Sequence, residues 1–175
     1  MALGILAVSI AGAWGCAPPR TAENQGAPPE LRLEGVRFRL FHGGDPLPRG
    51  SGTAAAVTYQ RDTTAVKATS LDLHVRDHSE EVALTAPAAA GIVSARTFEA
   101  SGGLRAVRGT DTAVTESARF DPAIGSKGLV VGDAPVELRG RGYQLQGNGF
   151  TLDPTVRQIV LRGGTRLVAS PQGGR

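Results

Sequence analysis

Apolar and polar residues alternate along most of this chain, most clearly near its C-terminal end. Between Val136 and Ala169, five short units each carry two apolar residues two positions apart, and the units begin 7, 7, 9 and 8 residues apart. In an extended strand such residues point to the same face. Gly, Asn or Pro stands in every gap, so the spacing predicts short strands joined by turns around one continuous apolar interior. The units are Val136–Leu138, Tyr143–Leu145, Phe150–Leu152, Ile159–Leu161 and Leu167–Ala169.

The same pattern runs through the body of the chain. Phe38 faces one way and its neighbours Arg37 and Arg39 the other, as in a half-buried strand. Pro87 is expected to end one such run, and no window of eleven or more residues shows a convincing helical stripe. Residues 31–170 are therefore predicted to form one all-β domain of about twelve to fifteen strands with almost no helix.

Glycines mark two places where the chain must bend. Leu138 and Tyr143 have opposite parity, and so have Leu145 and Phe150. Bends or bulges across 140–142 and 147–149 are therefore needed to return the apolar side chains to the interior, and glycine permits the backbone angles that this requires. Asn-Gly at 148–149 is also typical of a hairpin turn.

The N-terminal segment predicts export and a lipid anchor. Residues 1–15 carry no charge and are too short to span a bilayer comfortably, but they match the apolar core of an export signal. The only cysteine, Cys16, follows at once, which resembles a bacterial lipobox; an ordinary secretory signal and a truncated membrane anchor are the alternatives. All three place the domain outside the cytoplasm. Residues 16–30 are predicted to form a Pro-rich tether and 171–175 a flexible tail.

Composition and charge exclude few function classes but weigh against nucleic acid. Aromatic residues make up 5% of the chain, and small apolar residues supply most of the bulk, which suits the lining of an apolar groove. The net charge is +3, and the segment from Gly128 onward carries six Arg against three acidic residues. This excess fits either an anionic partner or a solvated face. With so few aromatics and no recognition motif, we expect no nucleic-acid partner.

Chemistry-bearing motifs are absent from the sequence. His74 and His78 lie near Asp72 and Asp77, but the local alternation predicts a strand there, and a metal site would need a third ligand with no obvious source. Nucleophile elbows, phosphate loops and paired thiols are missing. The sequence thus predicts a protein that is not an enzyme and has no metal or cofactor.

The segment from Ala118 to Val168 resembles the LptC-like proteins of lipopolysaccharide export, which share a β-jellyroll with LptA/OstA-type proteins. The resemblance rests on V-E-L-R-G-R-G-Y-Q-L-Q-G-N-G at 136–149, followed by an acidic turn and a final strand pair. It is good over about fifty residues and loose over 32–117. It implies a twisted, V-shaped antiparallel β-jellyroll, an open stack of two sheets.

The resemblance also implies a function. Such proteins take lipopolysaccharide from an inner-membrane ABC transporter and pass it along an apolar groove to a periplasmic jellyroll bridge, joining their neighbours by edge-strand addition. The expected location is the periplasm, anchored to a membrane through Cys16, with the inner membrane favoured over the outer. Gly140 is expected near the docking end. The residues expected to contact acyl chains are Phe38, Tyr59, Leu73, Phe98, Phe120, Leu138, Tyr143, Leu145, Phe150, Leu152, Ile159 and Leu161.

A second interpretation stays open from sequence alone. In it the protein is a scaffold lipoprotein of the cell envelope whose β-domain has a solid core and binds protein or glycan. A groove wall and a core give the same pattern of apolar residues, so only the packing of the two faces separates these interpretations.

Overall fold

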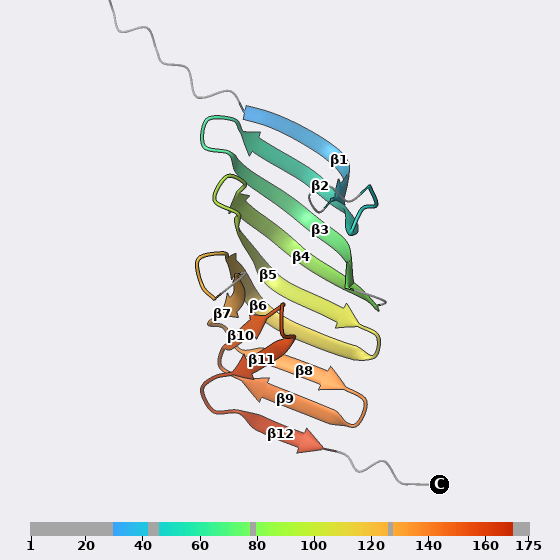
Figure 1. Ribbon diagram of the computed structural model, residues 1–175, viewed down its shortest axis with the longest axis vertical. Coiled ribbons are helices and arrows are strands. Elements are labelled where there is room, and N and C mark those ends of the chain that lie inside the picture. The colour runs from blue at the N-terminus through green and yellow to red at the C-terminus, as the bar shows by residue number, and fades with distance from the viewer. Residues whose placement is uncertain (1–29, 42–45, 78–79, 126–127, 170–175) are drawn as a thin grey trace, which may run out of the picture.

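The chain is built from strands throughout the part that the structure describes (Figure 1). The computed structural model describes residues 30–41, 46–77, 80–125 and 128–169. Within these ranges there are twelve strands and no helix, which confirms the predicted all-β class. The strands are β1 Glu30–Leu40, β2 Gly50–Gln60, β3 Ala65–Asp77, β4 Glu80–Ile92, β5 Thr97–Arg108, β6 Asp111–Asp121, β7 Leu129–Gly132, β8 Val136–Gly140, β9 Tyr143–Gly147, β10 Phe150–Asp153, β11 Gln158–Leu161 and β12 Arg166–Ala169.

All twelve strands belong to one open antiparallel sheet that forks after β6. From β1 to β6 each strand pairs with the next along the chain. The first half of β6 then pairs with β8, and its second half pairs with β7. One branch continues as β8, β9 and β12, and the other as β7, β10 and β11. The sheet therefore ends in β1 at one end of the long axis and in the two short strands β11 and β12 toward the other (Figure 1).

A line of interruptions, which we call the crease, crosses the middle of the long strands. The ladder skips or shifts register at Gly35 in β1, Ser70 in β3, Pro87 in β4 and Gly102–Gly103 in β5. All of these except Pro87 have positive φ, a conformation that bends a strand locally. Beyond β6 the crease falls in the linkers between β7 and β8, between β9 and β10, and between β11 and β12.

The crease divides the sheet into two wings. Wing A contains β7, β10, β11 and the halves of the long strands that pair with one another around Tyr59 and Phe98. Wing B contains β8, β9, β12 and the other halves, which pair around Phe38 and Leu84. Each long strand therefore contributes to both wings, whereas each short strand lies in only one.

The crease also changes which residues face inward, and it explains a wrong prediction. Strand β4 continues through Pro87 without a break, although the proline is expected from the sequence to end the strand. Proline cannot donate to a ladder, but the β3–β4 pairing is interrupted opposite Ser70, so no donor is needed there. Across this point the inward-facing set shifts parity, from Leu84 and Ala86 to Ala89 and Gly91.

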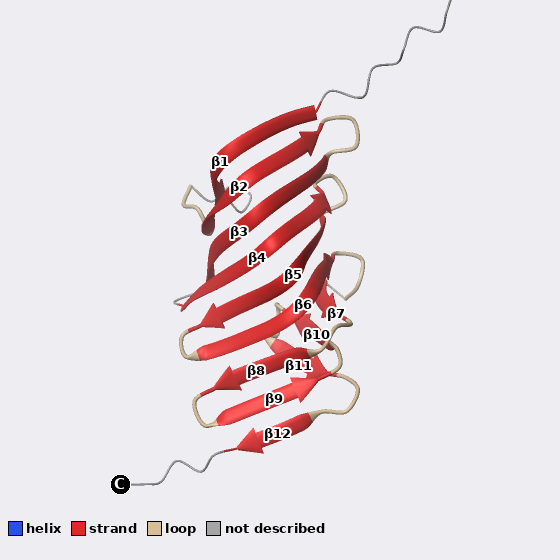
Figure 2. Cartoon of the chain, turned by 180° about the vertical axis from the view of Figure 1, so that it is seen from behind, coloured by secondary structure: helices blue, strands red, loops and turns tan. Residues whose placement is uncertain are grey.

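The buried core is small and lies at the crease near the fork. Phe150 of wing A packs with Leu104 and Val136 of wing B, which brings β10 against β5 and β8. Figure 1 shows β10 and β11 in front of the region where β6 and β8 run, and Figure 2 shows the same region from behind, which agrees with this contact. Ala86 and Ala118 complete the cluster. Among the described residues, no large side chain is completely buried.

The two glycine-rich segments have different roles. At 140–142 the chain makes a hairpin, because Gly140 pairs with Tyr143 and only Arg141 and Gly142 separate β8 from β9. At 147–149 the chain instead crosses the crease from β9 to β10, and these two strands do not pair. The expected bend is confirmed there, and Asn-Gly at 148–149 does not form a hairpin.

Candidate functional site on the inner face

Two apolar rows run the length of the sheet, one in each wing, and we call the surface that they form the inner face. Residues paired in register point to the same side of a sheet. In wing A the row is Leu31, Tyr59, Val66, Gly91, Phe98, Phe120, Val130, Leu152 and Ile159. In wing B it is Phe38, Gly52, Leu73, Leu84, Ala106, Ala113, Leu138, Leu145 and Leu167. Neither row contains a charged residue.

The twelve residues proposed from sequence as acyl contacts all lie on this face. Nine of them belong to the two rows. The other three stand beside the rows: Phe150 and Leu161 pair with one another in wing A, and Tyr143 lies two residues from Leu145 in wing B. The pairing register thus places residues more than a hundred positions apart in sequence on the same face of the sheet.

Burial differs along the inner face. At the fork Phe150 is 6% exposed, and Leu138, Leu152 and Leu161 pack against the core cluster. In β1–β3, Ala54 is the only buried hydrophobic residue, and Leu31 is 53% exposed. We therefore distinguish a closed part of the inner face, around the core cluster, from an open part, which comprises β1–β3 and the wing A half of β5 around exposed Phe98.

Three phenylalanine rings on this face lie over glycines of the neighbouring strand. The ring of Phe38 covers Gly52, that of Phe98 covers Gly91, and that of Phe150 covers Gly132; each ring pairs in register with the glycine beneath it. A Cβ on any of these glycines would meet the ring. The rings consequently lie along the sheet instead of projecting from it.

Gly140, expected near a docking end, has the same relation to Tyr143. The Tyr143 ring covers Gly140, and a Cβ there would meet the ring and the carboxylate of Asp111. Burial, assisted by the Asp111 charge, raises the pKa of Tyr143 above its usual value of 10.0, and Arg108 opposes this. The packing accounts for a glycine at 140, and a docking role there stays a prediction.

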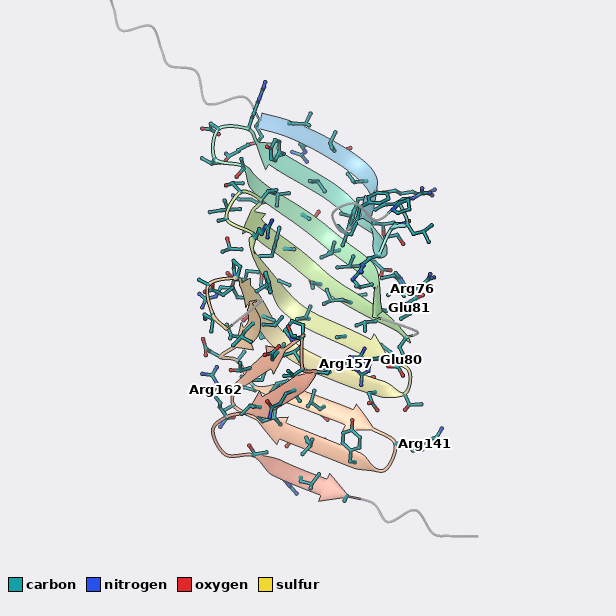
Figure 3. The ribbon with its side chains drawn as sticks, in the orientation of Figure 1. Arg76, Glu80, Glu81, Arg141, Arg157 and Arg162 are labelled. Atoms are coloured by element: carbon teal, nitrogen blue, oxygen red, sulfur yellow. The ribbon has the colours of Figure 1, made fainter. Side chains whose placement is uncertain are left out.

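Charged residues begin at the outer margin of wing B. Arg108 follows Ala106 on the inner side, and its Nε lies 3.3 Å from the Glu80 carboxylate. Figure 3 shows Glu80 and Glu81 at the margin where β3 and β4 end, and Arg141 at the turn between β8 and β9. The inner face is thus apolar within and charged at this border.

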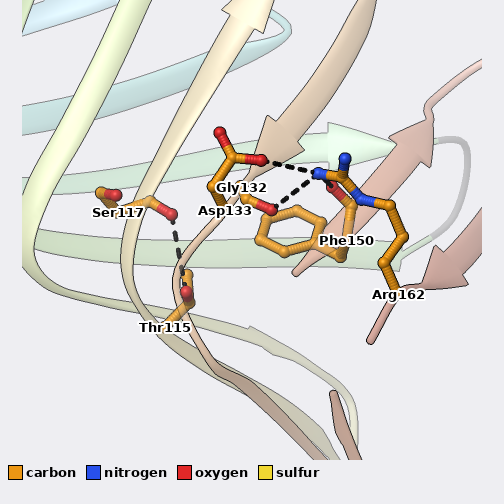
Figure 4. Close-up of polar contacts among 6 residues, drawn as sticks. All are labelled: Thr115, Ser117, Gly132, Asp133, Phe150 and Arg162. Atoms are coloured by element: carbon orange, nitrogen blue, oxygen red, sulfur yellow. Dashed lines mark hydrogen bonds and ion pairs between the residues drawn. The ribbon is translucent and has the colours of Figure 1, made fainter. Parts of the chain in front are cut away.

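Polar contacts at the fork join the linkers of the crease to one another and to neighbouring strands (Figure 4). Nη2 of Arg162, which follows β11, donates to the Gly132 carbonyl at 3.1 Å and to the Asp133 carboxylate at 2.9 Å. The buried hydroxyl of Thr115 donates to the Pro135 carbonyl at 3.0 Å. Sequence reasoning counted Arg162 only as part of a basic excess, because nothing local shows that it reaches a linker thirty residues earlier.

His74 lies on the outer face, between two carboxylates. Its Nδ1 is 2.6 Å from Glu81 and its Nε2 is 3.1 Å from Asp72. The hydrogen bond with Glu81 is the main reason that the pKa of His74 is raised above 6.5. Over the ranges that the structure covers, no group of three or more His, Cys, Asp and Glu side chains is arranged to hold a metal ion.

Several predicted features lie outside the described residues, namely the export signal, Cys16, the tether, His78 and the C-terminal tail. Within the described ranges, no helix is long and apolar enough to cross a bilayer.

No protein-family model matches the sequence, and neither does any curated protein. The function is therefore inferred from the inner face itself.

Proposed function

We propose that the protein is a non-enzymatic lipid carrier of the bacterial envelope, which holds the acyl chains of lipopolysaccharide against its inner face. It would receive the lipid from an inner-membrane ABC transporter and pass it to a periplasmic jellyroll protein. The proposal includes a periplasmic location and an anchor through acylated Cys16, with the inner membrane favoured.

One observation carries the proposal: two apolar rows without a charged residue extend over the whole sheet, and the protein's own side chains cover only part of them. Removing a methylene from water is worth about 0.8 kcal/mol, so a twelve-carbon chain gains roughly 9 kcal/mol when fully sheltered. An acyl chain is thin enough to lie between two walls that meet at the crease.

The edges of the sheet support the partner assignment. Within the described residues β1 pairs only with β2, and β11 and β12 each pair with a single strand, so both ends present free backbone donors and acceptors. Such edges pair readily with a strand of another chain. Neighbouring proteins would join at these two ends and leave the inner face free for lipid.

Photo-crosslinking tests the carrier role in cells. A photoreactive residue at Leu73 or Tyr59 should form an adduct with lipopolysaccharide, because both side chains lie on the open part of the inner face. The matched control is Thr58, which neighbours Tyr59 on the same strand but points to the outer face. No adduct at either inner position, or equal adducts at Thr58, would reject the proposal.

The scaffold interpretation predicts a different result. A protein that binds only protein or glycan should carry no lipid in native mass spectra, and its depletion should not arrest lipopolysaccharide export. Adducts at the inner positions together with arrested export would exclude it.

A further inference from the structure

A depression on the outer face of wing B is a second candidate site, separate from the inner face. It lies over β1, β2 and β3 and has a volume of about 600 Å³, within the range of small-molecule sites. Its polar lining is a grid of paired residues, in which Arg37 stands beside Thr53 and Arg39 beside Ser51. Gly52 lies between the two hydroxyls, and a side chain at this position would point to the inner face, toward the Phe38 ring.

The two arginines supply most of the charge. Arg37 and Arg39 are two positions apart on one strand, so both guanidinium groups stand on the same side of the sheet. Within the described ranges neither has an ion pair or side-chain hydrogen bond. Two guanidinium groups at this spacing can hold one phosphate through several charge-assisted hydrogen bonds, and the hydroxyls of Ser51 and Thr53 supply further donors.

The opposite wall carries Asp72, which would repel an anion if it stood alone. Its carboxylate lies 3.1 Å from Nε2 of His74, whose other nitrogen contacts Glu81. When His74 is protonated, the five charged groups of this region, including Arg37 and Arg39, sum to one positive charge. A protonated His74 leaves one net negative charge on this wall, which the two arginines outweigh, so the arginine side of the depression stays positive.

We infer that this depression binds a phosphate group carried on a polar molecule such as a sugar. The phosphate would lie between Arg37 and Arg39, over Gly52, and the polar body would extend toward Ser51, Thr53 and Asp72. Phe41, 59% exposed, flanks the site and offers a face against which a sugar ring can pack. This inference does not depend on lipid binding, because the site lies on the opposite side of the sheet.

Isothermal titration of the full chain at fixed ionic strength tests the inference, with glucose 6-phosphate, inorganic phosphate and glucose as ligands. We expect saturable binding of glucose 6-phosphate with one site per chain and none of glucose. Replacing Arg37→Gln or Arg39→Gln should weaken binding about tenfold, the loss of one charged hydrogen bond. The matched control is Arg32→Gln on the same strand in wing A, where Arg32 lies 3.7 Å from Glu34.

The outcomes separate clearly. Equal affinity for inorganic phosphate supports the phosphate site and excludes a contribution from the sugar. Absence of saturable binding overturns the inference, and so does equal weakening by Arg32→Gln, which would show a general charge effect. Melting curves of the three variants, which change only exposed side chains, check that each is folded.

Discussion

The open and closed parts of the inner face are built from the same alternating pattern but reach different degrees of burial. In β1–β3 each strand passes through the crease unbroken, so the two wings diverge from a single bend. At the fork the strands are split by linkers, and β10 folds over to place Phe150 against Val136 and Leu104. The degree of burial in this sheet therefore depends mainly on how the chain crosses the crease, and much less on how apolar the strands are.

Phe150 and Phe98 allow a direct test of this comparison, because both rings lie over a glycine in wing A. Phe150→Ala should lower the free energy of unfolding by about 3–5 kcal/mol, since it empties the core cluster. Phe98 is 44% exposed. Phe98→Ala should therefore lower the free energy of unfolding by about 1 kcal/mol or less. Urea denaturation measures both, and equal losses would contradict the division into two parts.

The glycines beneath the rings should show a smaller effect. Gly132→Ala should destabilise the protein by about 1–3 kcal/mol, because the new methyl group meets the Phe150 ring and the Ser117 carbonyl. Combining Gly91→Ala with Phe98→Leu should cost less than the sum of the single changes, since the smaller side chain relieves the contact with the ring and leaves only the contact with the Thr97 carbonyl. Strict additivity in urea titrations would show that ring and glycine are not coupled.

Arg162→Ala tests how much the polar contacts at the fork stabilise the closed part. Arg162→Ala removes the bonds to Gly132 and Asp133 and should cost about 1 kcal/mol, a modest value because the side chain is half exposed. Hydrogen exchange in β7 and β10 should quicken while β1–β3 are unchanged. Arg166→Ala on exposed β12 is the control and should fall within about 0.5 kcal/mol of the parent.

His74, on the outer face of β3, gives the smallest effect. Because its pKa is raised in the folded protein, its pairing stabilises the fold below pH 6.5, and this contribution disappears as the pH rises through the folded pKa. An NMR titration of the imidazole protons should give a midpoint above 6.5 that falls in Glu81→Gln. An unchanged midpoint in that variant would contradict the assigned cause.

Sequence alone predicted the strands and the side to which their residues point, because a period of two fixes the face. All twelve proposed contact residues share one face for this reason. The register that places Phe98 over Gly91 was not predictable, since pairing partners follow from turn lengths and bulges. Alternation does not indicate how closely two faces pack, so it did not distinguish buried Phe150 from exposed Phe98. The prediction at Pro87 was wrong because a strand can contain a proline where its pairing with the neighbouring strand is interrupted.

The crease has a consequence for how this architecture tolerates change in length. Because the strands of the two wings pair separately where the chain crosses between them, residues added in the linker at 133–135 leave the register of both wings intact. Additions at 148–149 or 162–165 would break only the backbone bonds that join these two linkers. The same additions within a wing would slip a strand by one position and reverse its faces. Insertions and deletions among relatives of this chain should therefore collect along a single seam of the molecule.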